Sequence, residues 1–296
     1  MKELLATMNP LDADFRTRAP APSTVWHWQD CSSWREAIRE VVSDVLDARV
    51  KDAIVGRDLD PSDFCCDDLS WLDEIVLSVH GATIDCVDLL AGRVEERFTA
   101  IRAAHGTRTR ASSFYDHGIR PPNWSSLLEE AIRSFGRAGF GEMEILRAVE
   151  ATEIGGPDGC VYVEANEAHL VEHCAHYMIY GSEDLLAVAS HLGPRGRAAL
   201  RDPERGAPMV FVCDVPMDLI GYADIRSMAG EALTLVCSEL LGDSELRIGQ
   251  SGLCIRGAIP PENIVGHYSP KTLVDPIEMR VVRRFDDAGA ELPPAE

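Results

Sequence analysis

Residues 104–109 read Ala-His-Gly-Thr-Arg-Thr, and residues 114–122 read Phe-Tyr-Asp-His-Gly-Ile-Arg-Pro-Pro. This stretch lies where the pattern of the chain changes. Before it, apolar residues recur mainly at helical spacing, whereas after it short helical segments alternate with strand-like runs. A helical front followed by mixed short helices and strands is typical of an α+β fold. The sequence therefore predicts an α+β protein with a helical N-terminal region.

The composition is that of an acidic globular protein. The chain of 296 residues has 49 acidic and 28 basic side chains, which gives a formal net charge of -21. Hydrophobic residues make up 46%, so a substantial core can form. Because a surface of this charge repels phosphate backbones and anionic lipids, nucleic acids and membrane surfaces are poor partners. The acidity serves solubility or, alternatively, the binding of a basic protein partner.

Several features bear on the location of the protein. No run approaches the roughly 20 apolar residues that a membrane helix needs, and residues 1–10 are too short and too polar for a secretory signal. The nine cysteines form an odd set without a CxxC pair, which indicates reduced thiols. The adjacent Cys65 and Cys66 fit buried apolar positions better than a redox pair. These features predict a cytoplasmic protein.

The chain divides into four predicted parts. Residues 1–24 contain three prolines and few large apolar groups, so we expect a poorly ordered leader. Residues 25–100 are predicted to be mainly helical, residues 101–286 form the α+β domain, and residues 287–296 form a flexible tail. Within the helical region, Ser33 and Glu36 have capping-box spacing and open a helix that runs to about Val50. A turn near 58–62 and helical segments over 67–77 and 84–90 follow.

The elements of the second part follow from caps and alternation. Ser126 and Glu129 predict the start of a helix with Leu127, Ala131 and Phe135 on its apolar face. Asn166 is expected to cap a helix that ends near residue 177. The other expected elements are a glycine-rich turn at 155–159, strands at 160–163 and 209–213, a helix at 184–192, a hairpin joining 246–248 to 253–256, and an alternating run at 277–281.

Three ordered fragments of this second part resemble the motifs of ADP-ribosyltransferases. Each fragment combines a strand-like run with a turn or helix signal, and together they cover roughly residues 100–270. The resemblance implies that residues 101–286 contain the mixed, mostly antiparallel, split β-sheet core of that family. The fragments are His105-Gly106-Thr107 with Gly118-Ile119-Arg120-Pro121, then Val161-Tyr162-Val163 with Ala175-His176-Tyr177, then residues 253–257 with Ile259-Pro260-Pro261.

The resemblance also implies a substrate, NAD, and residues that hold it. In the family the histidine of the first motif binds a ribose hydroxyl and the glycine lets the backbone approach the nicotinamide, which assigns His105, Gly106 and Thr107 to NAD binding. A tyrosine of the second motif stacks on the nicotinamide ring. Tyr162 matches that tyrosine, and Tyr177 matches a helix tyrosine of the poly-ADP-ribosylating members.

The third motif departs from the family pattern. Cleavage of the bond between nicotinamide and ribose passes through an oxocarbenium-like state, which a carboxylate stabilises. The family places that glutamate on the strand before the Ile-Pro-Pro turn, but this chain has residues 250–252, Gln-Ser-Gly, there, and Glu262 lies beyond the turn. Either Glu183 or Glu245 takes its place, or the chemistry differs, or the fold only binds. RNA 2′-phosphotransferases share the fold without that glutamate, but they rely on basic residues, which this acidic chain does not favour.

Three functions of different classes follow. The first is an NAD-binding enzyme that transfers ADP-ribose to an acceptor or hydrolyses NAD, with His105, Tyr162 and a carboxylate in the site. The alternatives are a non-catalytic acidic interaction or immunity-type protein on a degenerate version of the fold, and a small-molecule binding protein without NAD. His169 and His173 have the spacing of two zinc ligands, but no zincin glutamate or third ligand accompanies them, so no metal is expected.

Overall fold

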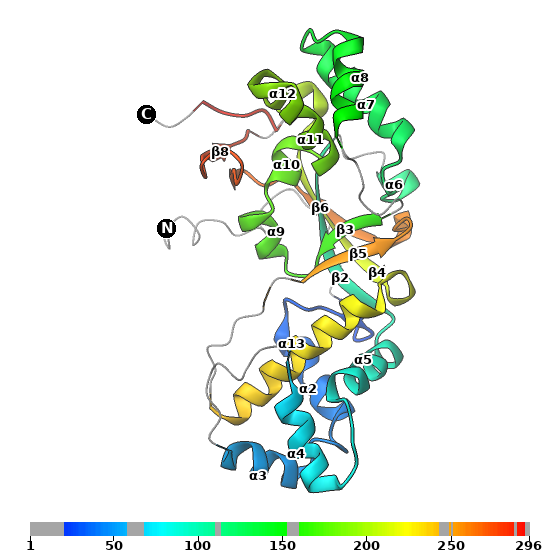
Figure 1. Ribbon diagram of the computed structural model, residues 1–296, viewed down its shortest axis with the longest axis vertical. Coiled ribbons are helices and arrows are strands. Elements are labelled where there is room, and N and C mark those ends of the chain that lie inside the picture. The colour runs from blue at the N-terminus through cyan, green and yellow to red at the C-terminus, as the bar shows by residue number, and fades with distance from the viewer. Residues whose placement is uncertain are drawn as a thin grey trace.

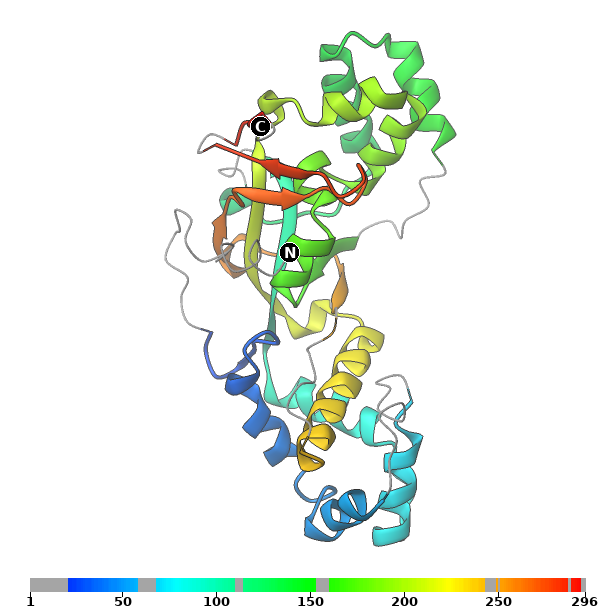
Figure 2. The same ribbon diagram turned by 90° about the vertical axis from the view of Figure 1, so that its left-hand side faces the viewer.

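The computed structural model describes residues 21–57, 68–109, 114–152, 160–242, 249, 251–286 and 289–293. It confirms the α+β class, because helices surround a mostly antiparallel sheet (Figure 1). A helical body lies at one end of the long axis, the sheet lies in the middle, and a second group of helices lies at the other end (Figure 1, Figure 2). No helix within the described ranges is long and apolar enough to cross a lipid bilayer.

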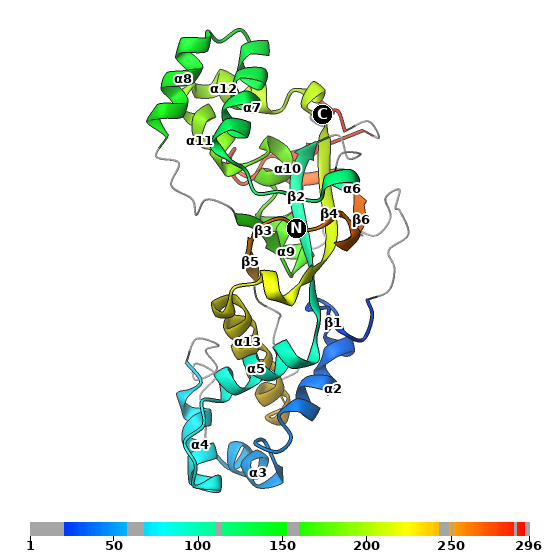
Figure 3. The same cartoon turned by 90° about the vertical axis from the view of Figure 1, so that its right-hand side faces the viewer.

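The main sheet has the order β5-β3-β2-β4-β6, with β5 and β6 at its edges (Figure 3). The central strand β2 pairs along its whole length with antiparallel β4. In contrast, β2 pairs with β3 at one position only, where Ala104 lies opposite Glu164. The short strand β1 adds in parallel beside β2. The strands are β1 (Val25–Trp26), β2 (Ala100–Thr109), β3 (Cys160–Glu164), β4 (Ala207–Pro216), β5 (Gly252–Arg256) and β6 (Ile264–Tyr268).

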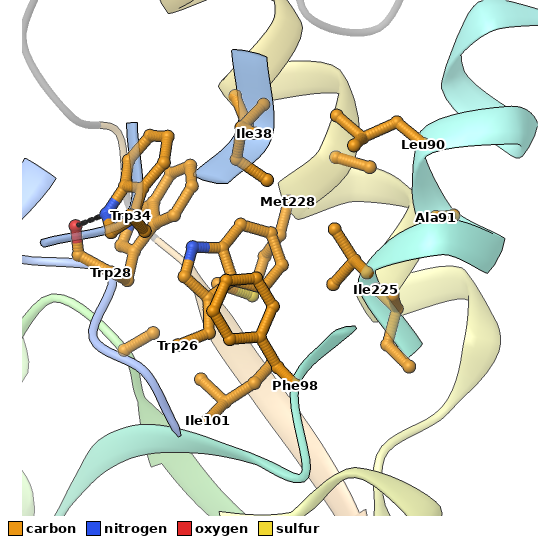
Figure 4. Close-up of a cluster of buried hydrophobic side chains, with 14 of the residues drawn as sticks. Trp26, Trp28, Trp34, Ile38, Leu90, Ala91, Phe98, Ile101, Ile225 and Met228 are labelled. Atoms are coloured by element: carbon orange, nitrogen blue, oxygen red, sulfur yellow. Dashed lines mark hydrogen bonds between the residues drawn. The ribbon is translucent and has the colours of Figure 1, made fainter. Parts of the chain in front are cut away.

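An aromatic cluster joins the helical body to the sheet (Figure 4). Trp28 and Trp34 stack with ring centroids 5.1 Å apart, and the indole N–H of Trp34 donates to the Trp28 carbonyl at 2.9 Å. Trp26, in β1, stacks on Phe98 with centroids 5.8 Å apart. Each large apolar side chain buried in this way stabilises the fold by about 1.5–3 kcal/mol. The helices of the body are α2 (Cys31–Val41), α3 (Ala48–Gly56), α4 (Ser70–His80), α5 (Cys86–Arg97) and α13 (Tyr222–Leu240).

Helix α13 comes from a distant part of the chain and completes this body. It packs against α2, α3 and α5. Its side chains Ile225, Met228 and Ala232 recur at helical spacing and are buried. The expected boundary at residue 100 assigned this segment to the second part, where no helix was predicted, although its apolar spacing is typical of one.

The other face of the sheet is covered by helices that follow β3. Helices α9 (Glu167–His173) and α10 (His176–Tyr180) pack on β2, and their apolar residues form a second core with Val210 and Val212 of β4. Beyond them a second group of helices stacks at the far end of the molecule: α7 (Trp124–Arg137), α8 (Glu142–Ala151), α11 (Glu183–His191) and α12 (Gly193–Leu200). The remaining elements are α6 (Phe114–His117), the 3-10 turns η3 (Pro203–Arg205), η4 (Met217–Leu219) and η5 (Pro261–Asn263), and the hairpin of β7 (Thr272–Val274) and β8 (Val282–Arg284).

The helical region differs from its prediction in one helix. The single helix expected from Ser33 to about residue 50 is two helices, α2 and α3. Ser33 does not cap α2, because it lies inside the first turn and its hydroxyl donates to the Asp30 carbonyl at 2.7 Å. Asp47 interrupts the apolar pattern and caps α3, where its carboxylate accepts from the backbone N–H groups of residues 49 and 50. The leader up to residue 20, the turn near 58–62 and the cysteine pair lie outside the described residues.

Several boundaries in the second part also differ. The cap of α7 is Asn123, three residues earlier than predicted, and Ser126 completes a reciprocal capping box with it. Asn166 caps α9 as expected, but that helix ends at His173 and α10 begins at His176. Residues 276–280 form a turn, and the nearby strand β8 starts only at Val282. The predicted strands at 160–163 and 209–213 and the helix at 184–192 are confirmed, whereas residues 155–159 and 246–248 lie outside the described residues.

Candidate functional site

The three motif-like fragments form three neighbouring strands. His105 lies in β2, Tyr162 in β3 and Leu253 in β5, and the sheet order places these strands side by side. The turns that follow the first and third fragments, near Ile119 and Ile259, also meet, although they lie far apart in the chain. Ile119 and Ile259 form an antiparallel bridge, with N–H to carbonyl distances of 2.9 and 2.8 Å.

Glycine is required at this bridge. Gly118 has φ +73°, and a Cβ built there would lie 2.2 Å from the Ile259 carbonyl oxygen. A side chain would therefore collide with backbone rather than with a movable side chain. The Gly-Ile and Ile-Pro-Pro segments thus depend on each other for their conformations.

His105 lies at the point where β2 and β3 separate. Its Nδ1 is 2.9 Å from the Tyr162 carbonyl, to which it donates a hydrogen bond. Burial lowers the pKa of His105, and the hydrogen bond to Tyr162 only partly opposes that effect. The imidazole is therefore neutral, with its proton on Nδ1 and with Nε2 as a hydrogen-bond acceptor.

His105 and the Tyr162 ring lie on different faces of the sheet. His105 is directly opposite Phe211, which belongs to the aromatic-cluster core, so strand alternation places the imidazole on that face. Val161 and Val163 belong to the same core, so the Tyr162 ring between them lies on the opposite face. The imidazole thus meets the main chain of Tyr162 and not its phenol.

The face of Tyr162 carries a cluster that we call the tyrosine site: Gly106, Tyr162, His176, Tyr177 and Glu183. The Tyr177 hydroxyl donates to Glu183 Oε1 at 2.8 Å, and His176 Nε2 is 3.3 Å from the same oxygen. A Cβ built on Gly106 would lie 3.3 Å from side-chain atoms of α9 and α10 and 3.5 Å from the Tyr177 Cβ. Gly106 therefore lets the helix that carries Tyr177 approach β2 closely. The Tyr162 ring, 47% exposed, completes the site.

Electrostatic effects link the members of the tyrosine site. Burial raises the pKa of Tyr177, and the hydrogen bond to Glu183 adds to it. Burial also raises the pKa of Tyr162, with further contributions from nearby groups that include Glu183 and Asp184. The pKa of Asp184 is raised by burial and then by Glu183. The result is a pair of neutral phenols beside two carboxyl groups, an environment that attracts a flat cation.

Glu164 is a buried carboxylate that the sequence analysis did not single out. It ends β3 and accepts from the backbone N–H groups of Ser251 at 2.7 Å and Asn166 at 3.1 Å, and from His169 Nδ1 at 2.9 Å. A Cβ built on Gly252 would lie 3.9 Å from Glu164 Oε2. The carboxylate thus lies beside the start of β5, where the family glutamate was expected. A glutamate directly after a strand and before a capping asparagine was its only signal.

The other predicted residues lie elsewhere. Thr107 lines a separate cavity at the end of β2, and Glu245 lies outside the described residues. His169 and His173 have ring centroids 4.9 Å apart, but no group of three or more potential ligands surrounds them or any other site in the described chain. A further hydrogen bond of 2.6 Å, which does not involve a predicted site residue, joins the Tyr115 hydroxyl and His267 Nδ1 on the Phe211 face. Comparison of the chain with family models, curated proteins and solved structures found no match.

Proposed function

We propose that the tyrosine site binds the nicotinamide ring of NAD and that the protein is an ADP-ribosyltransferase-like protein. The observation that carries this proposal is the meeting of three fragments. They are dispersed along the chain, each resembles one motif of that family, and they occupy the neighbouring strands β2, β3 and β5. The bridge between Ile119 and Ile259 joins the turns behind two of them. Fragments that resembled the three motifs only by chance would have no reason to lie on neighbouring strands, so their arrangement supports the resemblance.

The chemistry of the tyrosine site agrees with this ligand. The nicotinamide ring of NAD is flat and positively charged, so it can stack on the Tyr162 and Tyr177 rings while Glu183 and Asp184 balance its charge. When the bond from the ribose C1′ to the nicotinamide nitrogen breaks, nicotinamide leaves with the electron pair and positive charge develops on the ribose. The Glu183 carboxylate then stabilises that charge until the acceptor, or water, attacks C1′.

His105 acts in this proposal as a positioning residue. Its Nδ1–H holds the Tyr162 carbonyl, so it fixes β3 against β2 where the two strands are otherwise unpaired. Because the imidazole lies on the Phe211 face, opposite the tyrosine site, it does not contact the ribose of a nucleotide bound there. The free thiols of the described cysteines agree with the proposed cytoplasmic location.

A non-catalytic version of the same proposal has support of its own. Gly252 opens β5 without a carboxylate, and the neighbouring Glu164 uses its oxygens on Ser251, Asn166 and His169. A carboxylate that already accepts three hydrogen bonds is poorly placed to approach a ribose. In this version the protein binds NAD, with little turnover, and serves as an interaction or immunity-type protein.

Titration calorimetry with NAD tests the binding proposal. Tyr162→Ala is compared with Tyr222→Ala, because both tyrosines are 47% exposed and Tyr222 lies in the helical body. Loss of a stacked ring costs about 1–3 kcal/mol, so Tyr162→Ala should weaken NAD binding about tenfold or more, and Tyr222→Ala should not change it. Equal affinities in all three proteins, or no heat with any, would refute the proposal.

Release of nicotinamide separates the catalytic and non-catalytic versions. Chromatographic detection of nicotinamide from the wild type, lost in Glu183→Gln, supports catalysis by Glu183. If the wild type binds NAD without turnover, Gly252→Glu restores the expected carboxylate at an exposed position, and Gly252→Gln is the control of equal size. Gly252→Glu should raise the rate of nicotinamide release on the order of a hundredfold above that of the wild type, and Gly252→Gln should not raise it. No gain from Gly252→Glu would contradict the alignment of β5 with the third motif.

A further inference from the structure

A cavity of about 540 Å³ opens at the end of β2, between α7, the start of α11 and η3. Small-molecule sites commonly have volumes of about 300–1,000 Å³. Its most notable feature is charge: four arginines and two glutamates line it, in a chain whose formal net charge is -21. We call it the arginine cavity. The arginines are Arg108, Arg133, Arg137 and Arg205, and the glutamates are Glu130 and Glu204.

Arg108 is the most informative of these residues. Only 5% of it is exposed, and its guanidinium donates to the carbonyls of Ile179, at 3.5 Å, and Arg201, at 3.1 Å. Its Nε has no hydrogen-bond partner among the described residues, and none of the ion pairs within those residues includes Arg108. Burial lowers the pKa of Arg108 to about 10, so the group is still charged at neutral pH. Glu291 and Asp202 act on Arg108 from a distance, but no described carboxylate forms an ion pair with it, so a bound anion would be its first direct counter-ion.

Arg205 adds a second buried positive charge. Its side chain is 8% exposed, and its Nη1 donates to the carbonyls of Tyr180 at 2.8 Å and Leu200 at 2.7 Å. Burial lowers the pKa of Arg205 to about 10, and the nearby positive charge of Arg133 adds to this effect. Glu130 is its carboxylate partner, at 3.4 Å, but Glu130 also pairs with Arg133. One carboxylate therefore serves two guanidinium groups.

The mouth of the cavity supplies further donors. Arg137 is half exposed and only loosely held, 3.7 Å from Asp202 and 3.5 Å from Glu204. Ser134 and Ser182 line the wall, and Ser182 caps α11, so the positive end of that helix dipole faces the same space. The four arginines outnumber the two glutamates of the lining, and Asp202 beside Arg137 balances only part of this excess of positive charge.

We propose that the arginine cavity binds the phosphate group of a small phosphomonoester, with Arg108 and Arg205 at its base and Arg133 and Arg137 at its mouth. A phosphate group supplies negative charge to a lining that has an excess of positive charge, and guanidinium groups bind phosphate oxygens in pairs. The volume exceeds what a phosphate group alone fills, which leaves room for an organic part. This inference goes beyond NAD binding, because it rests on a different set of side chains from the tyrosine site.

Calorimetry with ribose 5-phosphate tests this proposal in the full chain. Ribose and inorganic phosphate are the comparison ligands, and Arg137→Ala and Arg108→Lys are the variants. Arg226→Ala is the matched control, because Arg226, like Arg137, is about half exposed and is held by two carboxylates. Ribose 5-phosphate should bind and ribose should not. Arg137→Ala and Arg108→Lys should weaken binding about tenfold, and Arg226→Ala should leave it unchanged.

The remaining outcomes are equally decisive. Inorganic phosphate that binds as tightly as ribose 5-phosphate would identify the bound group as free phosphate and overturn the phosphomonoester assignment. If neither ribose 5-phosphate nor inorganic phosphate binds at millimolar concentration, the proposed site is wrong. It is also wrong if Arg137→Ala and Arg226→Ala bind ribose 5-phosphate equally well. Tyr162→Ala should keep its affinity for ribose 5-phosphate, so a failure of NAD binding and a failure of this proposal can be told apart.

Discussion

The tyrosine site and the arginine cavity meet at two adjacent residues but have opposite character. Glu183 belongs to the acidic tyrosine site, whereas Ser182, the residue before it, lines the arginine cavity. The first site combines neutral phenols with carboxyl groups, and the second combines buried guanidinium groups with too few carboxylates. A single turn between α10 and α11 thus separates an acidic cluster from an arginine-rich cavity.

The largest effect on stability is expected from Gly118→Ala. Gly118 lies in the turn behind the first motif-like fragment, and it does not line the arginine cavity. Gly118→Ala places a Cβ against the Ile259 carbonyl at a positive φ, so it should lower the free energy of unfolding by about 2–4 kcal/mol. Urea denaturation measures this loss. Gly92→Ala in α5 is the control, because nothing lies within 4 Å of its Cβ position, and it should be neutral or stabilising. Equal stabilities for the two variants would show that the Ile119–Ile259 bridge is not formed.

A reciprocal pair of variants sharpens the comparison. Tyr162→Ala should weaken NAD binding about tenfold or more and leave ribose 5-phosphate binding unchanged, while Arg137→Ala should do the reverse. Each protein is titrated with both ligands by calorimetry. If either variant weakens both ligands equally, the two sites are one site, and the distinction between them is wrong.

The next effect is the pH dependence of stability that His105 causes, because its imidazole is held as a neutral group against β3. The folded state lowers the pKa of His105 below its unfolded value of about 6.5. A lowered pKa on a basic group contributes stability that is present above pH 6.5 and is lost as the pH falls through the folded value. The free energy of unfolding should therefore decrease between pH 7 and pH 5, and His105→Gln should reduce that slope. An unchanged slope in the variant would mean that His105 is not held as a neutral group.

The smallest effect is expected at Asp184. Its pKa is raised by burial and by Glu183, so it takes up a proton as the pH falls toward that raised value and the tyrosine site loses negative charge. NAD should then bind about two- to fivefold more weakly at pH 5 than at pH 7, which is the size of one partly screened charge interaction. The same protonation favours the folded state, because a raised carboxyl pKa gives stability at low pH that is lost as the pH rises. Asp184→Asn should remove the dependence of NAD affinity on pH that this group causes.

The sequence predicted four residues that the structure brings together in the tyrosine site, because their signals are local: Gly106, Tyr162, Tyr177 and Glu183. His105-Gly106-Thr107 and Val161-Tyr162-Val163 are short strand patterns, and both strands are present as expected. These short patterns do not predict on which face of the sheet a given side chain lies, because a shift of one residue in register moves it to the other face. His105 consequently lies on the Phe211 face, away from the Tyr162 ring.

The arginine cavity could not be predicted because its residues have no common motif. Arg108, Arg133 and Arg205 come from β2, α7 and η3, and only the packing of these elements brings them together. Helix α13 is a different case. Its buried Ile225, Met228 and Ala232 have clear helical spacing, but its place among the first helices depends on long-range packing that the sequence pattern does not encode.

Saturation-transfer NMR with NAD tests the central claim most directly, because it reports which end of the dinucleotide lies against protein. Stacking between Tyr162 and Tyr177 predicts the strongest saturation on the nicotinamide ring protons in the wild type, and its loss in Tyr162→Ala but not in Tyr222→Ala. Saturation confined to the adenine protons, or nicotinamide signals that Tyr162→Ala leaves unchanged, would contradict the claim.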